Sequence, residues 1–372
     1  MKAKVFWSIL SISIIAGLLY NAFLHGSDFH VFYLAGQRLR DGLEIYRRSD
    51  GPDPFKYHPA WAVAFAPLTL LPEPFAKFCF VGSQIGLWWY GALRIGKIFD
   101  VQFHQIKLFA LLLLLALNPL SAETGYGQIN ALLFVGAIFT IEWLEAEPQR
   151  PRRAGALIVI LASLKLNFAL LAVYALIKNR KSFLGMAYGL SGLQLITALS
   201  QGDGAGRSAY GEWIYLLMEQ SRRQQWSYEV QGFMRLAYEW LGTGYLWGWS
   251  SAIALIIGLG AWLHGRQPKT HPAAILSFWL AALFLVSPLA WWYQVILVYP
   301  LAFYLALRLP SAWQRNLAWS CLAFFCLGSY SLLGPTYLID FKTALGFFWP
   351  TLILLGLLIK FLGSQKSIVQ TE

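Results

Sequence analysis

Charged residues are scarce in this chain of 372 residues, of which 13% are charged and 58% are hydrophobic. An ordinary soluble domain carries about 25% charged residues, so this composition argues against that class. Negatively charged residues are rarer than positively charged ones, with 18 Asp and Glu against 29 Lys and Arg. The basic residues form short clusters between apolar runs, which is typical of the cytoplasmic loops of membrane proteins and argues against nucleic-acid binding. We therefore expect a multi-pass protein whose surroundings are the lipid bilayer.

Cysteine is nearly absent, and metal-binding patterns are missing. Cys79, Cys321 and Cys326 all lie within apolar runs, where we expect small buried hydrophobic side chains rather than disulfide partners. No group of carboxylates and histidines has metal-ligand spacing, and the chain contains no Asp-x-Asp. We therefore expect no metal and no cofactor. The same absence argues against a Mn²⁺-dependent reaction of a nucleotide sugar, because a diphosphate leaving group normally requires a metal ion.

Long apolar runs, by contrast, are abundant. The first run follows Lys2 and Lys4 and is longer than the roughly 7–15 apolar residues of an ordinary signal peptide. We predict an uncleaved membrane anchor, with a cleaved signal peptide as the alternative. The basic clusters then predict about twelve membrane segments with both termini in the cytoplasm. The apolar runs cover residues 5–24, 75–96, 106–120, 129–146, 154–177, 182–199, 246–264, 273–287, 294–308, 316–333 and 345–363.

The run at residues 154–177 decides the topology. If it crossed the membrane once, the basic cluster KNRK that follows it would lie on the outer side, against the positive-inside rule. We therefore predict two short helices, roughly 154–164 and 168–177, with a break at SLKLN (163–167). At about 1.5 Å per residue neither helix crosses ~30 Å of hydrocarbon, so the hairpin stops partway. Lys165 lies at its tip and should face an anion, with snorkelling to a lipid headgroup as the alternative.

The first outer loop, residues 25–74, predicts an amphipathic helix in the membrane interface, because its apolar residues recur at helical spacing. These residues are Phe29, Phe32, Tyr33, Gly36 and Leu39. Ser27 or Asp28 would cap this helix, a structural role worth about 1 kcal/mol. Alternatively, Asp28 would act as a general base at the membrane surface. Pro59 suits the N-terminus of a second helix.

A second outer loop, residues 200–245, mixes aromatic, acidic and basic residues with two helical patterns bounded by glycine. We predict that it forms a lid over the site and contacts the acceptor, with an amphipathic segment that carries no chemistry as the alternative. The other polar segments expected on the outer face are residues 118–128, residues 287–294 and the Lys165 tip.

Four sequence elements resemble glycosyltransferase family 87, a family of polytopic GT-C transferases that use polyprenyl-phosphate sugars. The first outer loop carries D-F-x-V-F-Y from Asp28 and F-K-Y-H-P at residues 55–59. The other elements follow in order and are GYGQINALL (125–133), AGALIVILASLKLNFALL (154–171) and SPLAWWYQ (287–294). The resemblance implies an all-α, polytopic GT-C-type fold with a short broken hairpin and interfacial helices, which we expect to form one domain over residues 1–372.

The resemblance assigns the general-base role to Asp28, which would deprotonate the acceptor hydroxyl. The Lys165 ammonium is the candidate for stabilising the leaving phosphate, and Arg222 or Arg223 would assist it. Four more side chains are candidates for binding the sugar or lining the same site, and each is about as often a structural hydrogen-bonder. They are Gln128, Asn130, Tyr57 and His58.

After Trp291 the family often has one or two histidines, where this chain has Tyr293 and Gln294. If the histidines of the relatives contact the donor phosphate, Tyr293 and Gln294 would replace them with neutral hydrogen bonds. The identity of the donor therefore depends on these two positions.

We predict an inverting, metal-independent membrane glycosyltransferase that moves a sugar, mannose by default, from a polyprenyl-phosphate donor to a glycolipid or glycan acceptor. One alternative is a GT-C enzyme that transfers a pentose or an aminosugar to lipid A or an O-antigen, and another is a transporter or flippase of lipid-linked sugars. No internal repeat is evident, which disfavours a transporter built from inverted repeats. The topology places the site on the periplasmic face of a bacterial inner membrane and leaves the oligomeric state open.

Overall fold

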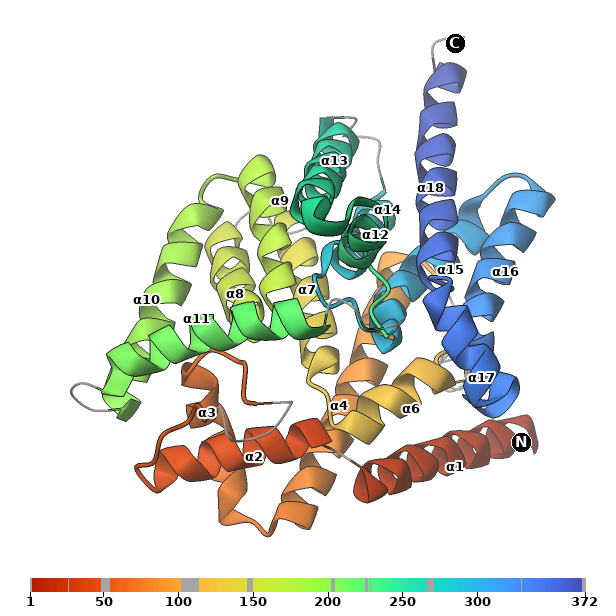
Figure 1. Cartoon of the computed structure of the whole chain (residues 1–372). Coiled ribbons are helices and arrows are strands. Elements are labelled where there is room, and N and C mark those ends of the chain that lie inside the picture. The colour runs from red at the N-terminus through yellow and green to blue at the C-terminus, as the bar shows by residue number, and fades with distance from the viewer. Residues whose placement is uncertain are drawn as a thin grey trace. The chain divides into compact units, whose positions relative to one another are not determined.

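The computed structural model describes residues 2–25, 27–47, 54–101, 114–145, 150–201, 205–224, 227, 229–265, 271–328 and 330–369. Helices dominate these residues (Figure 1), and the extended pairing found among them is an isolated antiparallel bridge between Val230 and Trp291. The predicted all-α class is therefore confirmed.

The chain forms two compact units, with unit 1 made of Met1–Gly91 and Ser121–Arg223 and unit 2 of Ala92–Leu120 and Gln224–Glu372. Unit 1 contains α1 (Lys2–Leu24), α2 (Ser27–Arg40), α3 (Ala60–Phe65), the 3₁₀ helix η2 (Ala66–Leu70), α7 (Asn130–Glu145), α8 (Pro151–Leu164), η3 (Leu166–Ala169), α9 (Leu170–Lys178), α10 (Ser182–Gln201) and nearly all of α11 (Ala205–Gln224). Unit 2 contains α12 (Phe233–Leu241), η4 (Gly242–Gly244), α13 (Tyr245–Gly265), α14 (Pro272–Val286), η5 (Trp292–Val298), α15 (Tyr299–Arg308), α16 (Ala312–Leu327), α17 (Tyr330–Thr343) and α18 (Phe348–Val369). The boundaries fall within α4 (Glu73–Ile98) and α6 (Leu117–Tyr126). The single domain over residues 1–372 stays a prediction.

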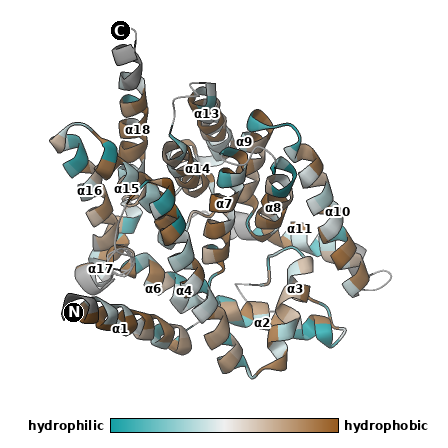
Figure 2. Cartoon of the chain, turned by 180° about the vertical axis from the view of Figure 1, so that it is seen from behind, coloured by the Kyte–Doolittle hydropathy of each residue, from teal (hydrophilic) through white to brown (hydrophobic). Residues whose placement is uncertain are grey.

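Among the described residues, three helical segments are long and apolar enough to cross a membrane: Val5–Leu24, Ser182–Ser200 and Phe233–Gly265. The number rises to 6 if each of three sharply bent helix pairs is one span. On α1 many large apolar side chains are exposed, Phe6 by 59% and Ile12 by 66%, and Figure 2 colours much of this helix as hydrophobic. Such a surface favours contact with lipid. The chain is therefore a membrane protein, and the total of about twelve segments stays a prediction.

The broken hairpin predicted for residues 154–177 is present. α8 ends at Leu164, and Lys165 has extended backbone angles, with φ −140° and ψ 115°, before η3 and α9 continue the chain. The predicted break at residues 163–167 is therefore confirmed. α8 has 14 residues and α9 has 9, so neither is long enough to cross ~30 Å of hydrocarbon alone.

Close packing in unit 1 fixes the position of α8. A Cβ atom added to Gly155 would lie 2.0 Å from the carbonyl oxygen of Ser182, and one added to Gly185 would lie 1.9 Å from that of Arg152. Glycine at both positions therefore lets α8 and α10 approach closely, as small residues do at helix contacts in membranes. α7 also packs on α8, so the break at Lys165 is held from two sides.

The helix predicted in the first outer loop is α2. It packs on α3 and η2, and the ring of Phe32 stacks on that of Phe65 with centroids 4.6 Å apart. α3 begins directly after Pro59, as predicted. The buried residues of α2 are Phe29, Phe32, Ala35 and Gly36, which follow the predicted helical spacing. The interfacial position of this helix, and the role of α11 and α12 in the second outer loop as a lid, stay predictions.

Candidate active site

A sharp bend of 116° between α6 and α7 places several polar side chains of unit 1. Two backbone hydrogen bonds end α6, from Gly127 N–H to the carbonyl of Thr124 (3.0 Å) and from Gln128 N–H to that of Glu123 (2.9 Å), which is the pattern of a Schellman cap. Gly127 has φ +70°, and a Cβ atom there would lie 2.8 Å from Cβ of Phe29. Glycine meets both requirements without strain, so Gly127 lets α2 lie directly against the bend.

Asp28 and Gln128 are in contact as a result. Asp28 is half-buried in the first turn of α2, where the partial positive charge of the helix N-terminus favours a negative group. Nε2 of Gln128 donates a hydrogen bond to Oδ2 of Asp28. Because an ionised carboxylate only accepts hydrogen bonds, the amide nitrogen must face Asp28. Gln128 therefore orients the Asp28 carboxylate.

Glu123, which no sequence pattern singled out, lies at the same bend. Its side chain is 2% exposed, and Oε1 accepts a hydrogen bond from Nδ2 of Asn130, the first residue of α7. The other carboxylate oxygen, Oε2, is buried and has no hydrogen-bond partner within the described part of the chain. A buried carboxyl group in this state is stabilised either by protonation or by a nearby positive charge.

Lys165 belongs to the same region of unit 1. Its half-buried side chain interacts electrostatically with the carboxylates of Glu123 and Asp28 and with the ammonium group of Lys56. Among the described residues, the Lys165 ammonium makes no hydrogen bond, and it has no carboxylate oxygen within 4.0 Å. Two cations and two carboxylates therefore occupy one region of unit 1, and the repulsion between the two ammonium groups favours an added anion beside them.

The segment that begins at Phe55 joins this region through the end of α8. The backbone N–H of His58 donates to the carbonyl of Ser163 (3.1 Å), and Nε1 of Trp61 donates to the Ser163 hydroxyl (2.9 Å). Ser163 lies two residues before Lys165 in the sequence. These hydrogen bonds therefore fix the loop before α3 next to the helix break.

Lys56 and Tyr57 are held in this segment by neighbouring helices. Nε1 of Trp213 in α11 donates to the carbonyl of Lys56 at 3.1 Å. Tyr57 is buried, and its ring packs edge-on against Phe32 of α2 with centroids 4.9 Å apart. Tyr57 therefore supports the packing of α2, and its contact with a substrate stays a prediction.

His58 is a neutral hydrogen-bond donor in this environment. Burial lowers the pKa of His58 to about 4, and its ring packs edge-on against Tyr210 and Trp213 with centroids 5.3 and 5.0 Å away. Nδ1 accepts the backbone N–H of Ala60 at 3.2 Å. The proton of the neutral ring is therefore on Nε2, and Nε2 is the atom that is able to donate to a substrate.

We expect acid to destabilise the protein through His58. The imidazole titrates near pH 6.5 when unfolded and at about 4 when folded, so the unfolded state binds more protons between these values. Stability therefore falls as the pH drops from about 6.5 to about 4. His58→Asn keeps an acceptor for Ala60 N–H and removes this titration, so its melting temperature should fall less. Thermal unfolding in detergent over this pH range tests the difference, and an equal fall in both proteins contradicts it.

Tyr293 and Gln294 belong to unit 2, where both are buried in η5. The ring of Tyr293 is parallel to that of Trp291 within 2°, with centroids 6.2 Å apart. A short segment at residues 229–231 pairs with this element, and the backbone N–H of Trp292 donates to the carbonyl of Glu229 at 2.9 Å. The roles of Tyr293 and Gln294 toward a donor stay predictions.

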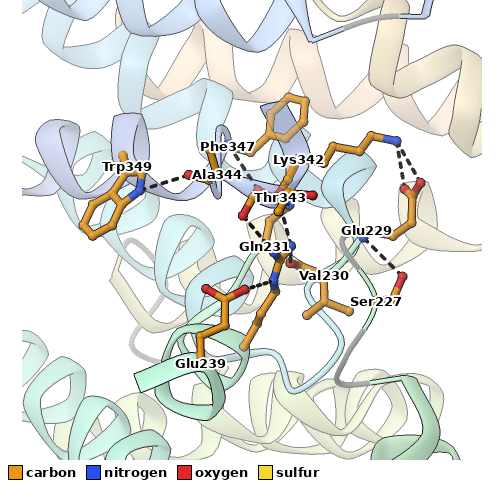
Figure 3. Close-up of polar contacts among 11 residues, drawn as sticks. Ser227, Glu229, Val230, Gln231, Glu239, Lys342, Thr343, Ala344, Phe347 and Trp349 are labelled. Atoms are coloured by element: carbon orange, nitrogen blue, oxygen red, sulfur yellow. Dashed lines mark hydrogen bonds and ion pairs between the residues drawn. The ribbon is translucent and has the colours of Figure 1, made fainter. Parts of the chain in front are cut away.

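Charged side chains connect residues 229–235 to the end of α17 (Figure 3). Nζ of Lys342 donates to both carboxylate oxygens of Glu229, at 2.9 and 3.0 Å. The same Nζ lies 4.5 Å from the ring centroid of Trp292. The buried guanidinium of Arg235 donates to the carbonyl oxygens of Lys342 and Thr343, at 3.0 and 2.8 Å. Arg235 therefore caps the C-terminal end of α17, and the Glu229–Lys342 pair fixes one face of Trp292.

The structure brings several of the predicted site residues into one region of unit 1. These are Asp28, Gln128, Asn130 and Lys165, with His58 on the adjoining segment. Glu123 and Lys56 also lie in this region and were not predicted from the sequence. An acidic residue in a mostly apolar stretch was the signal available for Glu123, and the position of Lys56 inside F-K-Y-H-P was the signal for the second cation. Arg222 and Arg223 lie in α11, and their side chains are outside the described residues.

No three His, Cys, Asp or Glu side chains gather as metal ligands in the part of the chain that the structure describes. The charges that remain for an anion are the ammonium groups of Lys56 and Lys165. Independence of metal ions stays a prediction.

Comparison with known proteins gives consistent similarities. The model of glycosyltransferase family 87 matches residues 55–288. A protein from Mycolicibacterium smegmatis is 26% identical over 367 residues, covering 90% of this chain and 82% of the relative. A protein from Mycobacterium tuberculosis is 30% identical over 162 residues, covering 40% of this chain and 35% of the relative's length. Each is named polyprenol-phosphate-mannose-dependent alpha-(1-2)-phosphatidylinositol pentamannoside mannosyltransferase. No solved structure matches the chain.

Proposed function

Because the chain belongs to glycosyltransferase family 87, with more than half of its length matched, we propose that it transfers a sugar from a polyprenyl-phosphate donor to a hydroxyl group of a glycolipid or glycan acceptor. Mannose is the default sugar, because the two relatives are named for polyprenol-phosphate-mannose. The reaction takes place at the periplasmic face of a bacterial inner membrane, with both chain termini in the cytoplasm.

The observation that carries this proposal is the Asp28 carboxylate oriented by Gln128 in a region of unit 1 where it also interacts electrostatically with Lys165. Transfer from a lipid phosphate requires a base for the acceptor hydroxyl and a positive group for the leaving phosphate. A carboxylate oriented by Gln128 and an ammonium group at a helix break supply these two functions at one place. Lys56, which interacts electrostatically with Lys165, adds a second positive charge.

The reaction is a substitution at the anomeric carbon of the donor sugar. The acceptor oxygen attacks this carbon, and its proton moves to the carboxylate of Asp28 as the new glycosidic bond forms. The bond between the anomeric carbon and the phosphate oxygen breaks, and its electron pair leaves with polyprenyl phosphate. The phosphate gains one negative charge in this step, which Lys165 and Lys56 stabilise without a metal ion. Attack opposite the leaving group inverts the anomeric configuration.

The two amide side chains at the α6–α7 bend take supporting roles in this scheme. Their nitrogens face carboxylates, Gln128 toward Asp28 and Asn130 toward Glu123. The amide oxygens are therefore the atoms left to accept hydrogen bonds from sugar hydroxyls. We assign neutral Nε2–H of His58 the role of hydrogen-bond donor to an oxygen of the sugar donor.

The experiment is a transfer assay with the purified protein in liposomes that contain labelled polyprenyl-phosphate mannose and a bacterial glycolipid extract. We expect the label to move to a new glycolipid and unlabelled polyprenyl phosphate to accumulate, with and without EDTA. Label that crosses the bilayer but stays on polyprenyl phosphate indicates a flippase and contradicts the proposal. Activity lost in EDTA and restored by Mg²⁺ contradicts metal independence, and transfer from a pentose or aminosugar donor alone identifies another sugar.

A further inference from the structure

Arginine side chains gather at the end of α8 that is remote from Lys165. Arg152 and Arg153 lie in the first turn of α8, and Arg180 precedes α10 by two residues; all three residues are exposed. Because α8 has 14 residues, this end lies about 21 Å from the break at Lys165. These three arginines, which we call the basic patch, are therefore outside the candidate active site.

The packing of α8 on α10 brings the two parts of the basic patch together. A Cβ atom on Gly185 would lie 2.8 Å from Cα of Arg152, and one on Gly155 would lie 2.0 Å from the carbonyl oxygen of Ser182. The first turns of the two helices are therefore in direct contact. Since Arg180 lies only two residues before Ser182 in the sequence, its backbone is close to the start of α8.

The basic patch has no counter-charge in the part of the chain that the structure describes. Glu145, at the end of α7, is occupied: Oε2 accepts from Nζ of Lys178 at 2.7 Å, and Oε1 accepts from the hydroxyl of Tyr174. None of the three arginine side chains forms an ion pair or hydrogen bond with a described residue. Positive charges near the start of a helix are also disfavoured by its macrodipole. An anion from outside the chain would therefore stabilise this end of unit 1.

Exposed apolar side chains follow the basic patch along α10. Phe183 and Tyr188 are each exposed by 63%, and Leu184 and Leu190 are exposed as well. α10 is also one of the helices that are long and apolar enough to cross a membrane, and most of its surface is not covered by protein. Such a surface favours contact with lipid chains. The basic patch, at the start of this helix, then lies at the level of the lipid headgroups.

We propose that the basic patch binds the phosphate group of an anionic phospholipid whose acyl chains lie along the exposed apolar side chains of α10. Guanidinium groups bind phosphate through charge-assisted, often paired hydrogen bonds, and basic sites between membrane helices recognise acidic headgroups. The bound lipid holds the starts of α8 and α10 together and stabilises the hairpin that carries Lys165. This inference goes beyond the proposed function, because it requires only that the chain is a membrane protein.

The test is the melting temperature of the purified full chain in detergent micelles, with added phosphatidylglycerol or with phosphatidylcholine of the same acyl chains. We expect phosphatidylglycerol to raise the melting temperature by about 4 °C or more beyond the effect of phosphatidylcholine, because a ligand that binds the folded state stabilises it. An equal rise with both lipids overturns the proposal. An equal rise with inorganic phosphate also overturns it, since the acyl chains would then have no part.

The variant Arg152→Gln/Arg180→Gln removes one charge from each part of the basic patch. It should lose about half or more of the extra rise that phosphatidylglycerol produces, whereas Arg152→Lys/Arg180→Lys keeps the charges and should retain more of it. The matched control, Lys97→Gln/Lys360→Gln, removes two exposed positive charges from unit 2 and should retain the extra rise. Equal losses in the two glutamine variants indicate a general effect of net charge and overturn the proposal.

Native mass spectrometry gives a readout that does not depend on thermal stability. The wild type and the Lys97→Gln/Lys360→Gln control should retain phosphatidylglycerol that Arg152→Gln/Arg180→Gln loses. Because retention is measured on the folded protein, a lower melting temperature of the arginine variant does not obscure the result. Equal retention by all three proteins overturns the proposal.

Discussion

Replacement of Asp28 by asparagine is expected to lower the rate of sugar transfer by about 10²–10⁴-fold, the usual contribution of a general base. Asparagine has nearly the shape of aspartate and still pairs with the Gln128 amide, but it does not accept the acceptor proton. The quantity to measure is kcat at saturating donor and acceptor. Because the contact with Gln128 is retained, the melting temperature should stay close to that of the wild type.

The matched control for this substitution is Asp41→Asn. Asp41 directly follows α2, is exposed, and pairs with Arg40 at 3.2 Å, where an ion pair contributes little. Transfer by this variant should stay within about 2-fold of the wild type, because surface changes are usually within ±0.5 kcal/mol. If Asp28→Asn instead lowers the melting temperature and leaves kcat unchanged, Asp28 serves the N-terminus of α2 and is not the base.

Lys165→Gln is expected to lower kcat/KM for the donor by about 10²–10³-fold, as the loss of one group that stabilises developing negative charge does in other enzymes. Glutamine still donates a hydrogen bond but carries no charge to balance the departing phosphate. Lys165→Arg keeps the charge and should retain more activity than the glutamine variant. The comparison requires initial rates over a range of donor concentrations.

Lys181→Gln is the control for the loss of a positive charge from the same hairpin. Lys181 is exposed and follows α9, at the end of the hairpin remote in sequence from the break. Its loss should leave kcat/KM within about 2-fold of the wild type. Equal activity of the Lys165→Gln and Lys181→Gln variants contradicts the assignment of Lys165 to the phosphate.

Features with local causes were predictable from the sequence. The break at Lys165 was predicted because a basic cluster follows residue 177. By the positive-inside rule this cluster belongs on the cytoplasmic side, so the run before it does not cross the membrane once. The buried face of α2 follows from the spacing of Phe29 and Phe32, and α3 begins after Pro59 because proline fits the first position of a helix. In each case the decisive residues lie within a few turns of the element that they define.

Contacts between distant segments were not predictable in this way. Nothing near Glu123 in the sequence indicates that its buried side chain lies in the same charged region as Lys165, because that proximity arises from the packing of α7 on α8 and from the bend between α6 and α7. The positive φ of Gly127 determines how the chain bends between α6 and α7. The presence of a glycine in GYGQIN did not indicate the direction of that bend. The neutral state of His58 likewise depends on Tyr210 and Trp213, which lie in another helix.

The cap that Arg235 forms on α17 has a consequence for the order in which the protein is made. A buried guanidinium without its acceptors is strongly unfavourable, and those acceptors are the carbonyl groups of Lys342 and Thr343. Unit 2 therefore completes its folding only after the ribosome has synthesised residue 343, whereas the last residue of unit 1 is Arg223. Because chains fold progressively during synthesis, the segment around Trp292, which Lys342 contacts, becomes fixed only after α17 has been made.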